Sequence, residues 1–437
     1  MLGEATCLEL LDAALAACEC DQAEAILHSG NSSLTRFAES VIHQNVAERD
    51  VMISVRAILG KRIGCARGNQ PTKDEAQSVA RRAVELARLS AEDEHFVSLP
   101  KPQPLPDVPT YADATAASTP EQRAEAVRAI VGIAESHSAK ASGSLSAESA
   151  EIAVANSLGV RAYTPATEAS LVTVVAGDDS SGYAEWHGTD ISKLDAVAIA
   201  DIAANKYSEG RGAQSIDPGE YTVILEPLAV GDMLSMLSYM GLGATAFQEG
   251  RSFMSGRIGE KLAGDNITLW DDATDPHQCP MPFDWEGVPK RKLTLIENGI
   301  ARGVAYDSYT ANKEGKESTG HAFPAPNTFG PSPTHLFLAP GEAALDDMIV
   351  STDRGILVTR FHYTNIVHEK QTIFTGMTRD GTLLIENGKI SHPINNLRFT
   401  QSILDALSNV QMISRDPELV QYAYVPALKI TNFAFTS

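Results

Sequence analysis

The sequence predicts an α+β protein in which an N-terminal α/β region is followed by a mainly antiparallel β domain. In the N-terminal half, helical spacing of apolar residues alternates with strand-like patterns, which is typical of helices packed on strands. The C-terminal half is richer in Gly, Pro and strand-forming residues, and two of its strands run into Asn-Gly, the preferred pair of a type I′ hairpin. We expect an N-terminal α/β domain with a Pro-rich linker over residues 1–110, a middle α+β segment over 111–216 and a C-terminal β-rich domain over 217–437.

The elements of the N-terminal domain follow from changes in hydrophobic period. Residues 3–27 carry apolar side chains at helical spacing and predict one helix that ends before Gly30. Residues 34–37 and 51–58 predict strands, whereas 74–89 has the apolar stripe of an amphipathic helix. Five prolines between residues 100 and 109 predict a stiff linker or a strap along the surface, because proline donates no backbone hydrogen bond.

The middle segment begins with a helix-capping signal. Thr119 and Pro120 predict the N-cap and the first position of a helix that reaches about residue 136. Residues 144–175 alternate and predict antiparallel strands. The other expected elements are a helix over 190–207 capped by Asp190, a turn at the main domain boundary over 217–220, a strand over 221–225, an apolar helix over 228–240, and hairpins at 295–300 and 384–390.

Composition and charge exclude several classes of function. The chain has 437 residues with 35 Lys+Arg against 56 Asp+Glu, a net charge of −21, which argues against binding to a nucleic-acid backbone. No apolar run reaches the ~20 residues needed to cross a bilayer, and the first thirty residues contain no Lys or Arg, unlike a secretory signal. The five cysteines are odd in number and sparse, which argues against a disulfide framework. We therefore expect a cytoplasmic protein that binds neither nucleic acid nor membrane.

The densest group of possible metal ligands is His362, His368 and Glu369. On a strand the two histidines face the same side but lie about 20 Å apart, so only a turn near residues 364–365 would bring them together. No His-Glu-x-x-His motif is present, because Thr372 stands where the second histidine would be. The group is either a metal site or, more in keeping with imidazole chemistry, a set of hydrogen-bonding residues in a polar groove.

Three other patterns are weaker. Residues 241–246 match a loose dinucleotide fingerprint, but a helix precedes them where a strand is required, so Gly241 more plausibly ends that helix. Cys18 and Cys20 point away from each other on the expected first helix, which argues against a metal or redox pair. Four further side chains lie in Pro/Gly-rich stretches, where they would either line a pocket or lie on the surface: His277, Cys279, His321 and His335.

Several short segments, taken in order, resemble the TldD/PmbA family. The N-terminal part has Ser-Leu-Thr-Arg-Phe at 33–37 and Gly-Lys-Arg-Ile-Gly at 60–64; the C-terminal part has the segments 253–261 and 283–289 and both Ile-Glu-Asn-Gly hairpins. The resemblance runs from about residue 8 to residue 430. It implies a dimeric protein with a peptide-binding cleft in a mostly β C-terminal region. The catalytic type in this family is a zinc peptidase with a His-Glu-x-x-x-His helix and a distant Cys ligand, acting on unfolded or modified peptides. A second type, TldE or PmbA, pairs with it.

The chain departs from the family's zinc motif. Residues 228–240, which correspond to the zinc-binding helix, contain no histidine, and residues 395–437 contain no cysteine. A catalytic zinc requires three protein ligands, and none of them carries over. The resemblance therefore implies a TldE/PmbA-like subunit with no metal or cofactor of its own. It would form a heterodimer with a zinc-bearing TldD-like subunit and help to hold an extended peptide by strand addition, in proteolysis or in processing of a biosynthetic precursor.

Two other interpretations remain open. The first is a self-sufficient metallohydrolase whose site has moved to His362, His368 and Glu369, with Glu369 as general base. The second is a peptide-binding dimer, including a homodimer, that has no catalytic partner. In the partner-subunit interpretation, residues 361–369 are expected near the cleft.

Overall fold

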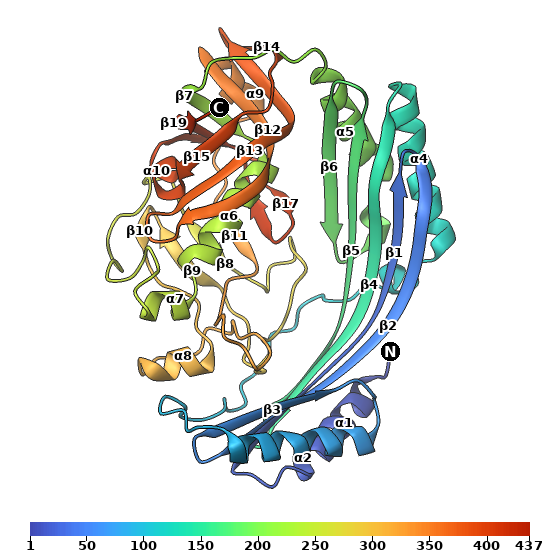
Figure 1. The fold of residues 1–437 in the computed structure, drawn as a ribbon, viewed down its shortest axis with the longest axis vertical. Coiled ribbons are helices and arrows are strands. Elements are labelled where there is room, and N and C mark those ends of the chain that lie inside the picture. The colour runs from blue at the N-terminus through green and yellow to red at the C-terminus, as the bar shows by residue number, and fades with distance from the viewer.

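The computed structural model describes residues 1–437 and contains three β-sheets (Figure 1). One six-stranded sheet is built entirely from residues 22–188, whereas a seven-stranded sheet and a second six-stranded sheet come from residues 219–435. The expected α+β class, with an N-terminal α/β region and a C-terminal part rich in antiparallel sheet, is confirmed.

The N-terminal sheet is long, curved and antiparallel throughout, in the order β3-β2-β1-β4-β5-β6 (Figure 1). Its strands are β1 (Gln22–Ala38), β2 (Val41–Leu59), β3 (Arg62–Gly68), β4 (Lys140–Asn156), β5 (Arg161–Ala176) and β6 (Ser181–Gly188). Four helices cover one face: α1 (Glu4–Ala16), α2 (Lys73–Leu89), α4 (Pro120–Ser136) and α5 (Ala196–Glu209). The other face is turned toward the C-terminal sheets.

The alternation of β1 explains this two-sided arrangement. Its residues Ala25, Leu27 and Phe37 are buried in the clusters beneath the helices, and they occupy alternate positions of the strand. The intervening residues face the opposite side, where Ile26 packs in a cluster with Phe283 of the C-terminal half. A single strand therefore contributes both to the helix-covered core and to the surface that meets the C-terminal sheets.

The seven-stranded sheet follows the order β12-β7-β19-β15-β13-β14, with β16 paired to β19. Because β12 also pairs with β13, five of these strands form a closed ring. Phe361, Phe374, Phe399 and Phe433 form its aromatic interior, with ring centroids of Phe361 and Phe399 only 4.4 Å apart. The strands are β7 (Gly219–Leu225), β12 (Arg354–His368), β13 (Ile373–Glu386), β14 (Lys389–Pro393), β15 (Arg398–Ser402), β16 (Val410–Ile413) and β19 (Leu428–Phe435).

The second C-terminal sheet has short strands in the order β10-β9-β8-β11-β18-β17. They are β8 (Leu269–Asp271), β9 (Leu293–Glu297), β10 (Ile300–Ala301), β11 (Leu336–Leu338), β17 (Glu418–Val420) and β18 (Ala423–Val425). Between the C-terminal sheets lies the apolar helix α6 (Pro227–Gly241), whose Met233, Leu234 and Leu237 are fully buried. The remaining short helices are α3 (Asp113–Ala116), η1 (Ile191–Lys193), α7 (Ala244–Gln248), α8 (Ser308–Lys313), α9 (Leu345–Val350) and α10 (Ile403–Ser408).

Several local predictions are confirmed. Thr119 caps α4, and its hydroxyl and the Gln122 side chain form a reciprocal capping box. In the hairpins β9–β10 and β13–β14, the Asn and Gly of each turn both have positive φ, 49° and 78° in the first and 53° and 73° in the second, as a type I′ turn requires.

Of the two predicted alternatives, a stiff linker or a strap, the Pro-rich segment is the strap. It has no helix, and it is tied to β5 by hydrogen bonds from the Thr167 N–H to the Thr110 carbonyl and from the Ala112 N–H to the Thr167 hydroxyl.

Three expectations were wrong. The first helix ends at Ala16, and Gln22 begins β1, because the apolar run after it is a strand buried between β2 and β4 and not a continued helical stripe. Cys18 and Cys20 consequently lie in the turn between α1 and β1. The helix expected over 190–207 is divided: Asp190 caps the short η1, and Asp195 caps α5.

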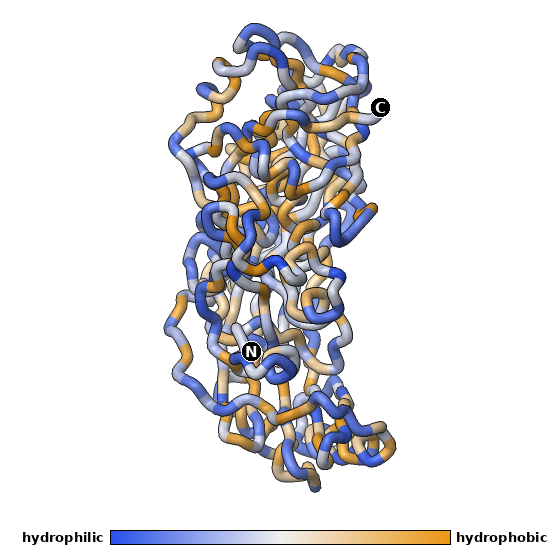
Figure 2. The backbone as a smooth tube through the Cα atoms, turned by 90° about the vertical axis from the view of Figure 1, so that its left-hand side faces the viewer, coloured by the Kyte–Doolittle hydropathy of each residue, from blue (hydrophilic) through white to orange (hydrophobic).

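No helix combines the length and the apolar character needed to cross a membrane. Along the backbone, apolar segments are interspersed with hydrophilic ones, and hydrophilic residues predominate in the outer loops (Figure 2).

Candidate functional site

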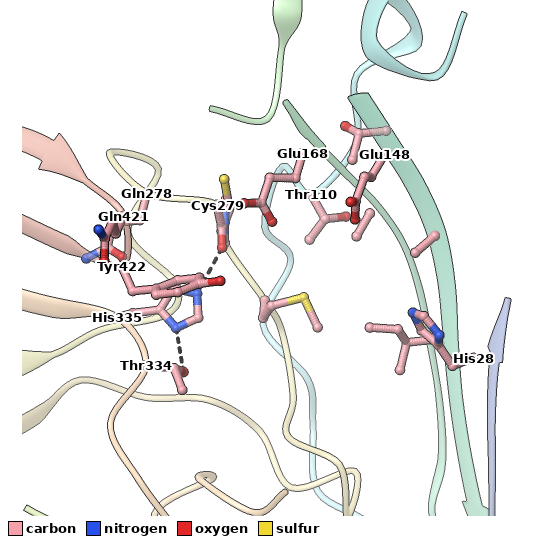
Figure 3. Close-up of a pocket in the computed structure, with 16 residues that line it drawn as sticks. His28, Thr110, Glu148, Glu168, Gln278, Cys279, Thr334, His335, Gln421 and Tyr422 are labelled. Atoms are coloured by element: carbon pink, nitrogen blue, oxygen red, sulfur yellow. Dashed lines mark hydrogen bonds between the residues drawn. The ribbon is translucent and has the colours of Figure 1, made fainter. Parts of the chain in front are cut away.

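The open face of the N-terminal sheet and the C-terminal sheets enclose a cavity of about 280 Å³ (Figure 3). One wall is formed by β1, β4 and β5, with Thr110 of the strap beside them. The other wall is formed by the loop around Cys279, by Thr334 and His335 before β11, and by the β17–β18 turn with Tyr422. Pockets between two structural units are common positions for ligand sites, so we take this cavity as the candidate functional site.

The strand register places two carboxylates side by side on the sheet wall. Glu148 of β4 lies directly opposite Glu168 of β5, and Glu148 also lies opposite Ser32 of β1, so all three share one face. Both glutamates are exposed, line the cavity and have no ion-pair partner. Desolvation raises the pKa of Glu168; His187 opposes this shift and Glu148 adds to it.

The opposite wall carries a histidine and a cysteine that are held in unreactive states. His335 Nε2 donates to the Cys279 carbonyl at 2.9 Å, and its Nδ1 lies 3.0 Å from the Thr334 hydroxyl. Burial lowers the pKa of His335 to about 4, so the ring is neutral at pH 7. Burial, reinforced by Glu168, raises the pKa of the Cys279 thiol to about 11. The pair is therefore not a nucleophilic Cys–His site, which requires a thiolate.

A hydroxyl, an imidazole and a carboxylate are aligned behind this wall. The His321 ring lies 2.9 Å from the Thr319 hydroxyl and 2.8 Å from Asp271, which also accepts the backbone N–H groups of Thr334 and His335. The order resembles a catalytic triad. However, the His321 and Asp271 side chains are fully buried, and the Thr319 hydroxyl donates to the Tyr306 carbonyl. The group supports the loop that carries His335 and is not a reaction centre.

Of the four loop residues singled out from the sequence, two lie in the cavity. Cys279 and His335 line it, whereas His321 is buried behind it. His277 is exposed. Its Nδ1 lies 2.7 Å from the Asp275 Oδ1 atom, and its ring stacks on that of Tyr424.

His362, His368 and Glu369 do not converge in the structure. β12 runs from Arg354 to His368 without an intervening turn, and its two histidines lie opposite Met377 and Ile373 of β13. Glu369 pairs with Arg251 at 3.0 Å, and His368 Nδ1 accepts the Gln371 N–H. None of the three lines the cavity. Across residues 1–437, no group of three or more His, Cys, Asp or Glu side chains is arranged to hold a metal ion.

A charged contact joins β6 of the N-terminal sheet to β12 and β13 of the C-terminal half. Arg360 of β12 pairs with Asp380, and its guanidinium lies 4.0 Å from the centroid of the Tyr183 ring. Asp232 of α6 lies near the same guanidinium. Burial raises the pKa of Asp232 to about 7; Arg360 opposes this shift and Glu185 adds to it.

A second pair bridges the same contact. Lys206 Nζ lies 2.7 Å from both carboxylate oxygens of Glu226, which is the N-cap residue of α6. The N-terminal end of α6 is therefore held by a cation from the N-terminal half of the chain.

Sequence inspection missed the two cavity glutamates. Each glutamate stands between two residues that are buried on the helix-covered face; Glu148, for example, stands between Ala147 and Ser149. This alternation of buried and exposed residues could have indicated that the glutamates lie on the open face of the sheet. The strand pairing that sets them opposite each other is not local information.

Comparison with known proteins places the chain in a family. Residues 218–437 match the PmbA/TldA metallopeptidase C-terminal domain, and residues 23–87 match the PmbA/TldA metallopeptidase domain 1. The chain belongs to the TldD/PmbA family. Among the relatives of this TldD/PmbA chain is a Metalloprotease TldD homolog of Buchnera aphidicola subsp. Acyrthosiphon pisum, 31% identical over 45% of this chain and 41% of that protein. A Metalloprotease of Methanothermobacter thermautotrophicus is 26% identical over 45% of this chain and 43% of that protein. The chain thus spans less than half the length of these two relatives.

The TldD/PmbA fold also matches a solved structure. TldE from Thermococcus kodakarensis superposes with a TM-score of 0.90 at 22% identity, covering 99% of this chain and all of that one. At this identity the match establishes the fold.

Proposed function

We propose that this chain is a TldE/PmbA-type subunit that lacks a zinc site of its own. It pairs with a zinc-bearing TldD-type subunit and supplies part of the cleft that holds an extended peptide. The pair acts as a peptidase on unfolded or modified peptides, or on a related biosynthetic precursor. We place it in the cytoplasm, which agrees with the five cysteines being free thiols.

This proposal rests on the small number of metal-binding side chains in α6. Catalytic zinc needs three protein ligands, usually from His, Asp, Glu or Cys. α6 offers only Asp232, whose pKa is raised by burial and lowered in part by the nearby Arg360 charge, and a cation near that carboxylate competes with a metal. Glu226 at the start of the helix is already neutralised by Lys206. The residues at the family's zinc position therefore do not fit a zinc ion, and the hydrolytic step is assigned to the partner subunit.

A free strand edge supports the peptide-holding part of the proposal. β7 pairs with β12 only over Gly355–Val358, so beyond Val358 one edge of β12 has no partner strand. An extended peptide binds such an edge through main-chain hydrogen bonds. Tyr363 and Val367 are exposed along this part of β12 and offer side-chain contacts.

Reconstitution with a TldD-type protein that carries His-Glu-x-x-x-His tests the proposal. We expect the two chains to co-elute as a heterodimer and to cleave an unfolded peptide that neither chain cleaves alone, with zinc found only in the TldD-type chain. Stoichiometric zinc in this chain, lost on His368→Ala, would contradict the proposal in favour of a relocated site. Failure to co-elute and to gain activity would leave a peptide-binding protein without a catalytic partner.

A further inference from the structure

We propose that the cavity of Figure 3 selects a positively charged side chain, lysine or arginine, of an extended peptide, and that Glu148 and Glu168 bind it. This inference rests on the proposed peptide-binding function and adds a substrate class to it. Four features of the cavity carry it.

The first feature is a pair of like charges that forms no salt bridge. Glu148 and Glu168 are direct cross-strand neighbours, and like charges in that position destabilise a sheet. Neither carboxylate forms a salt bridge, and none of the sixteen residues that line the cavity is Lys or Arg. The cations of the nearby charged contact, Lys206 and Arg360, are bound to Glu226 and Asp380. A cation from outside the chain would relieve this repulsion.

The second feature is the neutrality of the two histidines in the cavity. Burial lowers the pKa of both His28 and His335, so that neither imidazole supplies a positive charge at neutral pH. Neither of these two imidazoles therefore offsets the charge of the glutamates, and the wall that faces the glutamates does not repel a cation.

The third feature is a hydrogen-bond acceptor in the wall. Gln278 is only 4% exposed and lines the cavity. Its Nε2 donates to the Leu336 carbonyl at 2.8 Å, which fixes the amide in the wall. Its amide oxygen is an acceptor for the N–H groups of a guanidinium, an ammonium or a peptide backbone.

The fourth feature is an aromatic side chain at the cavity mouth. Tyr422 is 66% exposed in the turn between β17 and β18. Tyr422 lines the same cavity as Glu148 and Glu168, and burial together with the charges of these two glutamates raises the pKa of its hydroxyl. An exposed ring beside two carboxylates suits a long side chain with an apolar stem and a cationic end. Two carboxylates without a third ligand do not suit a metal ion.

Peptide-binding measurements on the full chain test the inference. Four fluorescein-labelled peptides share one Gly/Ser/Ala scaffold and differ only at the central residue, which is Arg, Lys, norleucine or Glu. By fluorescence anisotropy at low salt, we expect the Arg and Lys peptides to bind about tenfold more tightly than the norleucine peptide, and the Glu peptide to bind most weakly. The advantage should shrink at high salt, because screening weakens exposed charge pairs.

A matched pair of double variants assigns the effect to the cavity. Glu148→Gln with Glu168→Gln should abolish the preference for Arg and Lys. Glu48→Gln with Asp50→Asn removes the same charge from exposed positions on the same face of β2, outside the cavity, and should keep the preference. Thermal melts establish that both variants fold, and the cavity variant should be at least as stable as the parent because repulsion is relieved.

The outcomes separate the inference from the proposed function. Equal binding of the four peptides, or an unchanged preference in the cavity variant, would overturn charge selection and leave peptide binding intact. If no peptide binds to the chain, alone or with its TldD-type partner, the proposed function fails and the inference fails with it.

Discussion

Arg56 of β2 and Glu286 of the C-terminal half form an ion pair with 3.0 Å between the Arg56 Nη2 and Glu286 Oε1 atoms. The same Nη2 lies 2.8 Å from the Oε2 atom of Glu24 in β1, so one guanidinium forms ion pairs with two carboxylates. Glu24 and Glu286 are 1% and 5% exposed. This buried triad joins the N-terminal sheet to the C-terminal half of the chain, at the end of the sheet away from Arg360.

Removing Arg56 should destabilise the protein strongly. Arg56→Met leaves two buried carboxylates unpaired, and we expect a loss of about 3–5 kcal/mol in the free energy of unfolding. Glu286→Gln is the control, because it leaves a balanced pair of Arg56 and Glu24 and should cost about 1 kcal/mol or less. Urea unfolding followed by circular dichroism measures both. Similar losses in the two variants would show that charge balance is not what the triad contributes.

Asp232 should make stability depend on pH. Its folded-state pKa is raised to about 7 from an ordinary 3.8, so the folded protein binds the extra proton between these values. The stability that comes from this group is therefore present at pH 4 and is lost as the pH rises to about 7. Asp232→Asn removes the titration, and the variant should gain about 1–3 kcal/mol relative to the parent between pH 4 and pH 8. Unfolding midpoints that move in parallel across this range would contradict the assignment.

Gly299 in the β9–β10 hairpin should tolerate no side chain. Its φ is +78°, and an added Cβ would lie 2.3 Å from the Ala263 carbonyl oxygen and 2.6 Å from that of Gly264. Gly299→Ala should cost about 2–4 kcal/mol, from the left-handed conformation and from the backbone clash together. Gly315→Ala is the matched control, with φ +64° and no atom within 4 Å, and should cost only about 1 kcal/mol. Thermal melts of the two variants compare these costs, and equal shifts would rule out the clash.

The cysteines should differ widely in reactivity. The hydrogen bond with Cys18 is the main cause that lowers the pKa of Cys20 to about 7, whereas burial raises those of Cys7 and Cys279 to about 11. Since the thiolate is the reactive form, iodoacetamide at pH 7.5 should modify Cys20 well before Cys279. Peptide mapping by mass spectrometry at several times gives the order. Modification of Cys279 first would show that its thiol is neither protonated nor protected in solution.

Local sequence signals predicted the elements well where one interaction decides the structure. The cap at Thr119 and the Asn-Gly pairs each act within a few residues, and all of them form as expected. The first helix was predicted too long because the apolar residues from Ala23 to Leu27 satisfy a helical spacing and are also a buried strand, which short apolar runs do not distinguish.

The candidate site was only half visible in the sequence. Cys279 and His335 were singled out by residue type, and the structure brings both to the cavity. Glu148 and Glu168 were not singled out. Their proximity arises from the pairing of β4 with β5. The opposite wall of the cavity, which contains no Lys or Arg, comes from residues more than a hundred positions further along the chain. Such long-range arrangement has no local signature.

The alternation along the N-terminal strands links the acidic wall to the helix-covered core. Ala147, beside Glu148, and Ala169, beside Glu168, are buried on the helix side of the sheet. Inserting or deleting a single residue upstream in β4 would exchange the two faces of the strand. The Glu148 carboxylate would then point into the core and the Ala147 side chain into the cavity. A change of length within these strands would therefore disturb the core and the cavity together, whereas a substitution at fixed strand length can change the cavity alone.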